Sequence, residues 1–86
     1  IGVFAFSGCS SLTDISIPQS VKKIGKYAFS DCYNLMSISI PPLVTNIQEG
    51  TFYGCSNLTS ISIPKGCKVD KYAFEGCPEN LVITRY

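Results

Sequence analysis

The stretch Leu12-Thr13-Asp14-Ile15-Ser16-Ile17-Pro18 decides the fold, because the chain repeats its pattern twice more. The copies are Leu35-x-x-Ile38-x-Ile40-Pro41 and Leu58-x-x-Ile61-x-Ile63-Pro64, and the three copies are evenly spaced. Apolar and polar residues alternate in each copy up to a proline, which is typical of a short β-strand with one buried face. The period of ~23 residues lies between about 20 and 50, the range that indicates a stacked array of similar units. The sequence therefore predicts a repeat solenoid.

Composition narrows the classes of function. The 86 residues include seven Lys/Arg and six Asp/Glu, which gives a net charge of +1, and like charges form no run. Binding to nucleic acid or to an anionic membrane surface would need a concentrated basic patch, so we expect neither. No apolar stretch approaches the ~18 residues of a membrane span. Because the chain starts at Ile1, we expect a piece of a longer chain, with further repeats or domains on its N-terminal side.

Written in register, the repeats divide the chain into about four coils of ~23 residues each. We expect a single solenoid fragment, 1–86, made of coils 1–23, 24–46 and 47–68 and a shorter, cap-like coil 69–86. Residues related by the period form columns, and the apolar columns are expected to build the core. These columns are Ile1/Ile24/Ile47/Val69, Phe6/Phe29/Phe52/Phe74, Cys9/Cys32/Cys55/Cys77, Leu12/Leu35/Leu58, Ile15/Ile38/Ile61/Ile83, Ile17/Ile40/Ile63 and Val21/Val44/Cys67.

The segments around each strand suggest the rest of a coil. Stacked strand copies are predicted to form one continuous parallel sheet. Before the strand, Ala28-Phe29-x-x-Cys32-x-x-Leu35 places apolar side chains at steps of three, which favours one turn of 3₁₀ or short α-helix. After the proline we expect an extended arm with a second short strand. The third coil is one residue shorter than the first two, and a loop at Lys65–Lys68 is expected to absorb the deletion.

The residues from Leu12 to Cys32 carry a family resemblance. Their pattern, Leu-x-x-Ile-x-Ile-Pro-x-x-Val-x-x-Ile-x-x-x-Ala-Phe-x-x-Cys, resembles the BspA-type leucine-rich repeat, and the resemblance extends over essentially the whole chain. It implies a curved solenoid from a surface or secreted protein that serves adhesion and protein recognition. The chain departs from leucine-rich repeats in general after the strand, where Ser20, Leu43 and Gly66 stand near the place of the usual asparagine. No asparagine ladder is therefore expected there.

Five cysteines occupy packing positions. Four share one column and Cys67 replaces Val21 and Val44 in another, so we expect buried free thiols. A disulfide between stacked neighbours stays open as an alternative, because adjacent strands lie within disulfide range. A zinc site is disfavoured, since the chain has no Cys-x-x-Cys and no histidine. The missing histidines also remove the commonest general base, and the six carboxylates have no paired arrangement, so we expect neither an enzyme nor a cofactor.

The outward positions of the strands are the candidate binding face. They are Asp14, Ser16, Ser37, Ser39, Ser60 and Ser62. Small hydroxyl side chains also suit a crowded parallel sheet without any ligand, and no Trp, Tyr or Arg stands among them, although binding hot spots favour those residues. Four tyrosines lie on turns and arms instead, where a sharper contact is possible: Tyr27, Tyr33, Tyr53 and Tyr72. Asn57-Leu58-Thr59 fits the acceptor pattern for N-glycosylation, conditional on a eukaryotic secretory origin.

These observations favour a non-enzymatic module for protein–protein interaction or adhesion. The expected partner is a protein or an extracellular-matrix ligand, and the resemblance implies a cell-surface or secreted location. The alternative is a structural spacer that presents a neighbouring domain and has no ligand of its own, which the lack of anchor residues on the sheet face favours. A hydrolase would need a catalytic domain outside these residues.

Overall fold

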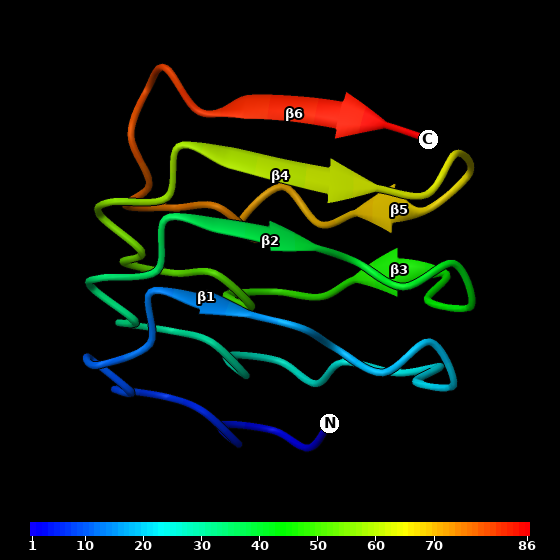
Figure 1. Ribbon diagram of the computed structural model, residues 1–86, viewed down its shortest axis with the longest axis horizontal. Coiled ribbons are helices and arrows are strands. Elements are labelled where there is room, and N and C mark those ends of the chain that lie inside the picture. Colours follow the sequence, from blue (N-terminus) through cyan, green and yellow to red (C-terminus); the bar gives the residue numbers. More distant parts are fainter.

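The chain winds upward so that one strand of each turn lies above the previous one. The computed structural model describes all residues, 1–86, and contains a four-stranded parallel sheet in the order β1-β2-β4-β6 (Figure 1). Its strands are β1 (Asp14–Ile15), β2 (Ser37–Ser39), β4 (Ser60–Ile63) and β6 (Val82–Arg85). The arms that follow the prolines pair as β3 (Asn46–Ile47) and β5 (Lys68–Val69), also in parallel. The predicted repeat solenoid, its parallel sheet and the second strand of the arm are thus confirmed.

The register of the sheet follows the period of the sequence. Ile15 pairs with Ile38 and Ile38 with Ile61, one full period on in each case, whereas Ile61 pairs with Ile83, one position short of a period. Ser39 still faces Ser62, but Asn46 already faces Lys68. The missing residue is therefore lost between these two points, in the loop after Pro64, as the sequence predicted.

The predicted helical turn before each strand is absent, and the structure has no helix of any kind. Alternate amides explain why. The N–H groups of Ala28, Ser30 and Cys32 donate to the carbonyl three residues back, as a 3₁₀-helix requires. Those of Tyr27, Phe29 and Asp31 donate instead to the carbonyls of Glu49, Thr51 and Tyr53 in the next turn of the chain. Since helices need consecutive bonds along one segment, only isolated turns form. Left-handed backbone at Tyr27 (φ 58°) and Asp31 (φ 57°) accompanies this alternation.

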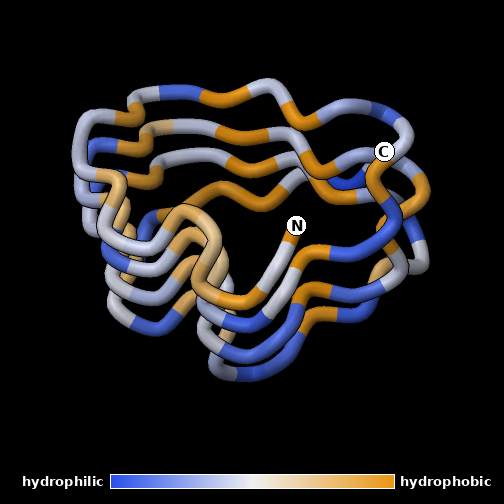
Figure 2. The backbone as a smooth tube through the Cα atoms, turned by 90° about the horizontal axis from the view of Figure 1, so that it is seen from below, coloured by the Kyte–Doolittle hydropathy of each residue, from blue (hydrophilic) through white to orange (hydrophobic).

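The core is a stack of identical side chains. Phe6, Phe29, Phe52 and Phe74 lie face to face, with ring centroids 5.3, 5.5 and 5.6 Å apart. Figure 2 shows the hydrophobic residues recurring at the same place in successive turns of the chain. Columns are fully buried at their central members, such as Leu35 and Leu58, and half-buried at the N-terminal end, as at Leu12. Ile83 was placed in a core column, but it is 47% exposed because no further strand covers β6.

A column of asparagines lies before the strands. Asn34 Nδ2 donates to the Ser10 carbonyl (2.6 Å) and Asn57 Nδ2 to the Tyr33 carbonyl (2.7 Å). Each amide thereby ties one turn of the chain to the turn below it. The chain thus has an asparagine ladder, although not at the position where leucine-rich repeats in general carry one. No helix of the structure is long and apolar enough to cross a membrane.

Candidate interaction surfaces

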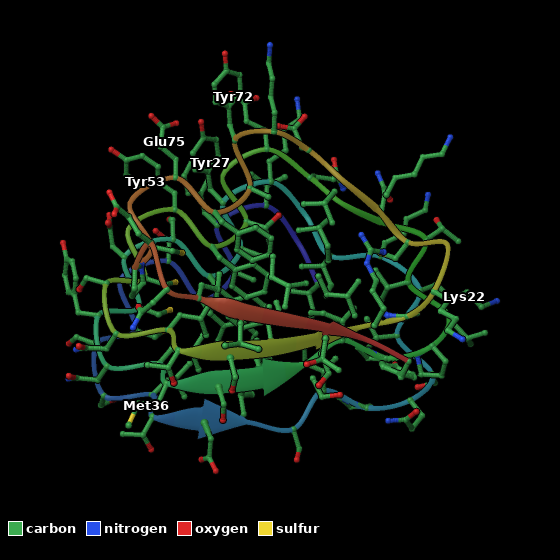
Figure 3. All side chains as sticks on the ribbon, turned by 90° about the horizontal axis from the view of Figure 1, so that it is seen from above. Lys22, Tyr27, Met36, Tyr53, Tyr72 and Glu75 are labelled. Atoms are coloured by element: carbon green, nitrogen blue, oxygen red, sulfur yellow. The ribbon has the colours of Figure 1, made fainter.

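The sheet face consists of the side chains that point away from the core along the four strands. Strand pairing aligns Asp14, Ser37 and Ser60 in one row, and Ser39 and Ser62 in a second. Ser16 follows β1 on the same side. All six candidate residues are exposed except Ser62, which is half-buried. The structure therefore brings the predicted residues together on one surface, which lies along the lower side of the sheet in Figure 3.

Strand β6 adds two residues to these rows that the sequence reasoning missed. Val82 continues the row of Ser60 and Thr84 continues that of Ser62. Val82 is 58% exposed, and Met36, the residue directly before β2 (Figure 3), is 55% exposed. The fourth copy of the strand phrase has lost its leucine position and its proline, so its outward residues were not recognised. The column Ile15/Ile38/Ile61/Ile83 already gave the register of β6, so the residues on either side of Ile83 could have been added to the face from the sequence.

An open hollow of about 390 Å³ lies where the chain leaves β1. It brings Ser16 and Ser39 together, and its lining residues are Ile15, Ser16, Ile17, Pro18, Gln19 and Ser39. Hydroxyl, amide and backbone groups can form hydrogen bonds to a partner there, but no charged side chain lines the hollow. This part of the sheet face can therefore form hydrogen bonds to polar groups of a partner.

The cysteine column is a structural ladder. Cys32, Cys55 and Cys77 each donate a weak S–H hydrogen bond to the carbonyl of a phenylalanine one turn below, with sulfur–oxygen distances of 3.1 to 3.2 Å. Burial raises the pKa of the Cys55 thiol to about 12 and that of Cys77 to about 11. Thiols protonated at neutral pH are poor nucleophiles and metal ligands. No group of three or more His, Cys, Asp or Glu is arranged to hold a metal ion.

Asn57, the predicted glycosylation acceptor, is exposed. Its Nδ2 atom, to which a glycan would be attached, already donates to the Tyr33 carbonyl as a rung of the asparagine ladder. Thr59, the third residue of the acceptor pattern, donates its hydroxyl to the Met36 carbonyl (3.1 Å). Both polar groups of the pattern therefore hold one turn of the chain on the next.

A second surface, which we call the aromatic edge, consists of Phe4, Tyr27, Tyr53 and Tyr72 with Glu49 and Glu75. The Phe4 and Tyr27 rings are stacked with centroids 5.2 Å apart, and Tyr53 meets Tyr27 edge-on at 6.5 Å. Figure 3 shows the three tyrosines and Glu75 projecting together on the side of the molecule away from the four-stranded sheet. The fourth tyrosine of the prediction, Tyr33, is 50% exposed and has no aromatic partner.

The fold defines the class of this protein as a leucine-rich-repeat solenoid, with short parallel strands stacked at the repeat period. Residues 1–84 match the family described as "BspA type Leucine rich repeat region (6 copies)". The chain belongs to this family, so the resemblance stated from the sequence is confirmed.

Two solved structures share the fold along nearly the whole chain. A leucine-rich cell surface protein from Faecalibacterium prausnitzii A2-165 is 32% identical over 98% of this chain, with a TM-score of 0.89. A leucine-rich repeat protein from Bacteroides ovatus ATCC 8483 is 38% identical over 99% of it, with a TM-score of 0.75. The chain spans only 22% and 24% of the length of these two proteins. Among curated proteins no significant match was found.

Proposed function

We propose that this chain is a non-enzymatic interaction or adhesion module of a surface or secreted protein, and that it binds a protein or matrix ligand through the sheet face. The observation that carries the proposal is the alignment of Asp14, Ser37 and Ser60 in one exposed row across adjacent parallel strands. Membership of the BspA-type family and the likeness to a leucine-rich cell surface protein support the location and the class of role.

The physical basis is a rigid, repetitive surface. Side chains on stacked strands stand ~4.8 Å apart, so a partner can contact several hydroxyl groups without ordering any loop. The sheet face lacks large anchor residues apart from Met36 and Val82, which lie near its rim. Many small polar contacts around these two apolar residues give a modest affinity for one module, and repetition along a longer array would raise it through multivalency.

A substitution set with a charge-matched control tests the sheet face. The triple variant Asp14→Arg, Ser37→Arg, Ser60→Arg places bulky cations across it and changes the net charge by +4. The control, Ser10→Arg, Ser56→Arg, Glu79→Arg, changes the net charge equally at exposed positions elsewhere. Binding to intact cells and to purified matrix proteins is expected to fall at least about tenfold for the first set only. Equal binding by the first set and the parent would remove the sheet face from the proposal.

The alternative is a spacer that presents a neighbouring domain. The small, uniform side chains of the sheet face favour it, because binding hot spots are usually large. A spacer binds nothing by itself, and replacing this segment by unrelated repeats of equal length leaves the function of the full-length protein intact. An interaction module loses function in that exchange.

A further inference from the structure

The aromatic edge is built by three neighbouring columns of the repeat, of which Lys26, Glu49 and Lys71 form one. Phe4, Tyr27, Gly50 and Tyr72 occupy equivalent positions in successive turns, and Tyr53 and Glu75 belong to a neighbouring column. Phe4, Tyr53 and Tyr72 are 57%, 43% and 47% exposed, although burial of such rings would stabilise the fold. Exposed aromatic residues gathered on one side of a small domain mark interaction sites more often than a scatter of single residues does.

Gly50 fixes the position of the central ring. It has a left-handed backbone (φ 65°), and a side chain there would overlap the Cε1 and Cδ1 atoms of Tyr27. The Tyr27 ring therefore leans over Gly50 while the Phe4 ring stacks on its other face. Tyr27 is thereby held in one orientation, with its hydroxyl directed at Glu49 (3.4 Å). A prepositioned ring loses little conformational entropy when a partner binds.

Carboxylates dominate the electrostatics at this ring. Glu49 raises the pKa of the Tyr27 hydroxyl most, and burial and Glu75 add to the rise. Lys26 and Lys71 flank Glu49 in its own column. Four of the remaining cations belong to the segments that follow the strand prolines: Lys22, Lys23, Lys65 and Lys68. Figure 3 shows Lys22 at a distance from Tyr27 and Glu75. No Asp or Glu occurs in the loop segments 18–23, 41–46 and 64–68, so these loops carry cations alone, whereas the aromatic edge carries both signs of charge.

The chain already places one of its own cations on this surface. The ammonium group of Lys71 lies 5.0 Å from the centroid of the Tyr72 ring, within the range of a cation–π interaction. The N–H of Tyr72 donates to Asp70 Oδ1 (2.9 Å), which holds the turn that carries both residues. Tyr72 thus has a ring face that accommodates a lysine side chain.

From these features we propose that the aromatic edge binds a lysine- or arginine-rich segment of a partner protein. The apolar stems of the partner's basic side chains pack on Tyr53 and Tyr72, and their charged groups pair with Glu49 and Glu75. This surface lies away from the sheet face and goes beyond the function proposed above, so either site can fail without the other. Complementary charge steers such an encounter and suppresses partners of the wrong sign.

The test measures binding of the full chain to a fluorescent peptide that alternates lysine and serine, with the corresponding glutamate–serine peptide as reference. The double variant Glu49→Gln, Glu75→Gln is expected to weaken binding of the lysine peptide about tenfold, because the loss of two exposed ion pairs changes the affinity by about that factor. Tyr53→Ser with Tyr72→Ser is expected to weaken it about fivefold or more. Glu79→Lys changes the net charge by the same +2 as the double glutamine variant, at an exposed position outside the edge, and is expected to stay within about twofold of the parent.

Thermal unfolding by circular dichroism confirms that each variant keeps its fold, as the exposure of the altered side chains predicts. Equal affinity for the lysine and glutamate peptides overturns the proposal, as does a loss in Glu79→Lys as large as that in the double glutamine variant. Binding of a neutral polysaccharide that depends on the tyrosines but not on the glutamates would make the edge a carbohydrate site and would also overturn it. So would self-association of the chain that the double glutamine variant abolishes.

Discussion

Gly50 determines both the local backbone conformation and the position of the Tyr27 ring on the surface. Its left-handed φ disfavours any side chain, and the ring of Tyr27 fills the space that a Cβ atom would need. Gly66 has a similar left-handed backbone (φ 82°), but nothing lies within 4 Å of the position of its Cβ. Comparing alanine substitutions at these two glycines therefore separates the cost of backbone strain from the cost of steric overlap.

We predict that Gly50→Ala destabilises the protein more than Gly66→Ala does. Left-handed backbone at alanine costs about 1–2 kcal/mol at either site. Overlap with Tyr27 adds about 1–3 kcal/mol at Gly50 alone, because backbone and ring must both shift. Urea denaturation measures the difference. Equal losses for the two variants would show that Tyr27 moves aside freely and is not held over Gly50.

At the scale of the element, Phe29 and Phe52 of the phenylalanine stack are the largest fully buried side chains. We predict that Phe29→Ala lowers the free energy of unfolding by about 3–5 kcal/mol, since Phe29 is fully buried between Phe6 and Phe52 and leaves a cavity. Phe6→Ala is expected to cost clearly less, because Phe6 is half-buried and has one aromatic neighbour. An unchanged melting temperature for Phe29→Ala would contradict its place in the core.

The thiol ladder makes a prediction about reactivity. Native-state labelling with a thiol reagent at pH 8 is expected to be slow for Cys32, Cys55 and Cys77. Their thiols are protonated, and each S–H group donates a hydrogen bond to a carbonyl one turn below. Cys9 is expected to react fastest, since it is half-buried and donates to no such carbonyl. Mass spectrometry of the labelled peptides gives the order. Rapid and equal labelling of all four cysteines would be incompatible with the ladder.

The same ladder makes stability depend on alkaline pH. Burial raises the pKa of Cys55 from 9.0 to about 12, so between these values the unfolded chain has lost a proton that the folded chain keeps. Stability is therefore fully present below pH ~9 and falls as pH rises toward ~12, by up to about 1.4 kcal/mol per pH unit. Cys55→Ala removes this dependence while other groups still titrate. Parallel stability–pH curves for the parent and Cys55→Ala would show that Cys55 has no such pKa shift.

Sequence periodicity was sufficient for the sheet and not for the turns. The alternation at Ile38 and Ile40 depends only on side-chain direction along a strand, which is local and regular. The Phe29-to-Leu35 spacing also fits a helical turn, and only the hydrogen bonds to the next turn of the chain, as from Phe29 to Thr51, rule that out. Such bonds depend on a neighbour that is close in space but distant along the sequence. The local spacing of apolar residues carries no information about them.

The candidate surfaces show the same limit. The outward row of serines follows from the strand phrase, whereas Val82 continues that row in a fourth copy that lacks the proline and the leucine spacing of the phrase. The aromatic edge was foreseen only as four scattered tyrosines, of which Tyr33 lies apart. Stacking of columns brings Tyr27, Tyr53 and Tyr72 onto one side, and glycine at position 50 lets the first ring lean over the next turn.

At the scale of the whole molecule, the stack assigns three chemistries to three sides. The sheet face carries mostly small polar side chains, and the aromatic edge carries tyrosines and glutamates (Figure 3). The loop segments 18–23, 41–46 and 64–68 carry four of the six lysines. The net charge of +1 hides this separation. Because strand pairing aligns equivalent positions of the repeat, each side is built from the same columns in every turn.

A stack of this kind is held together by contacts between adjacent turns, so its stability should vary along the stack. Central amides such as those of Phe29 and Ile40 lie among side chains that are fully buried, whereas β6 is exposed along its whole length and contacts one neighbouring strand. Opening β6 breaks one interface, but opening β2 breaks two. We therefore predict that native-state hydrogen exchange at the amides of Val82 and Tyr86 is at least about tenfold faster than at Phe29 and Ile40, although all four donate backbone hydrogen bonds of 2.8 to 3.0 Å.

The exchange rates of the four amides are compared at low denaturant concentration, where exchange occurs mainly through partial opening and not through global unfolding. If all four amides exchanged with one common free energy, the turns would open as a single cooperative unit. The interfaces between turns would then be strong relative to the turns themselves. In that case a change at one side of the molecule, such as Gly50→Ala beneath the aromatic edge, would be felt equally at the sheet face. With graded exchange, its effect decays from turn to turn, and the two surfaces can bind independently.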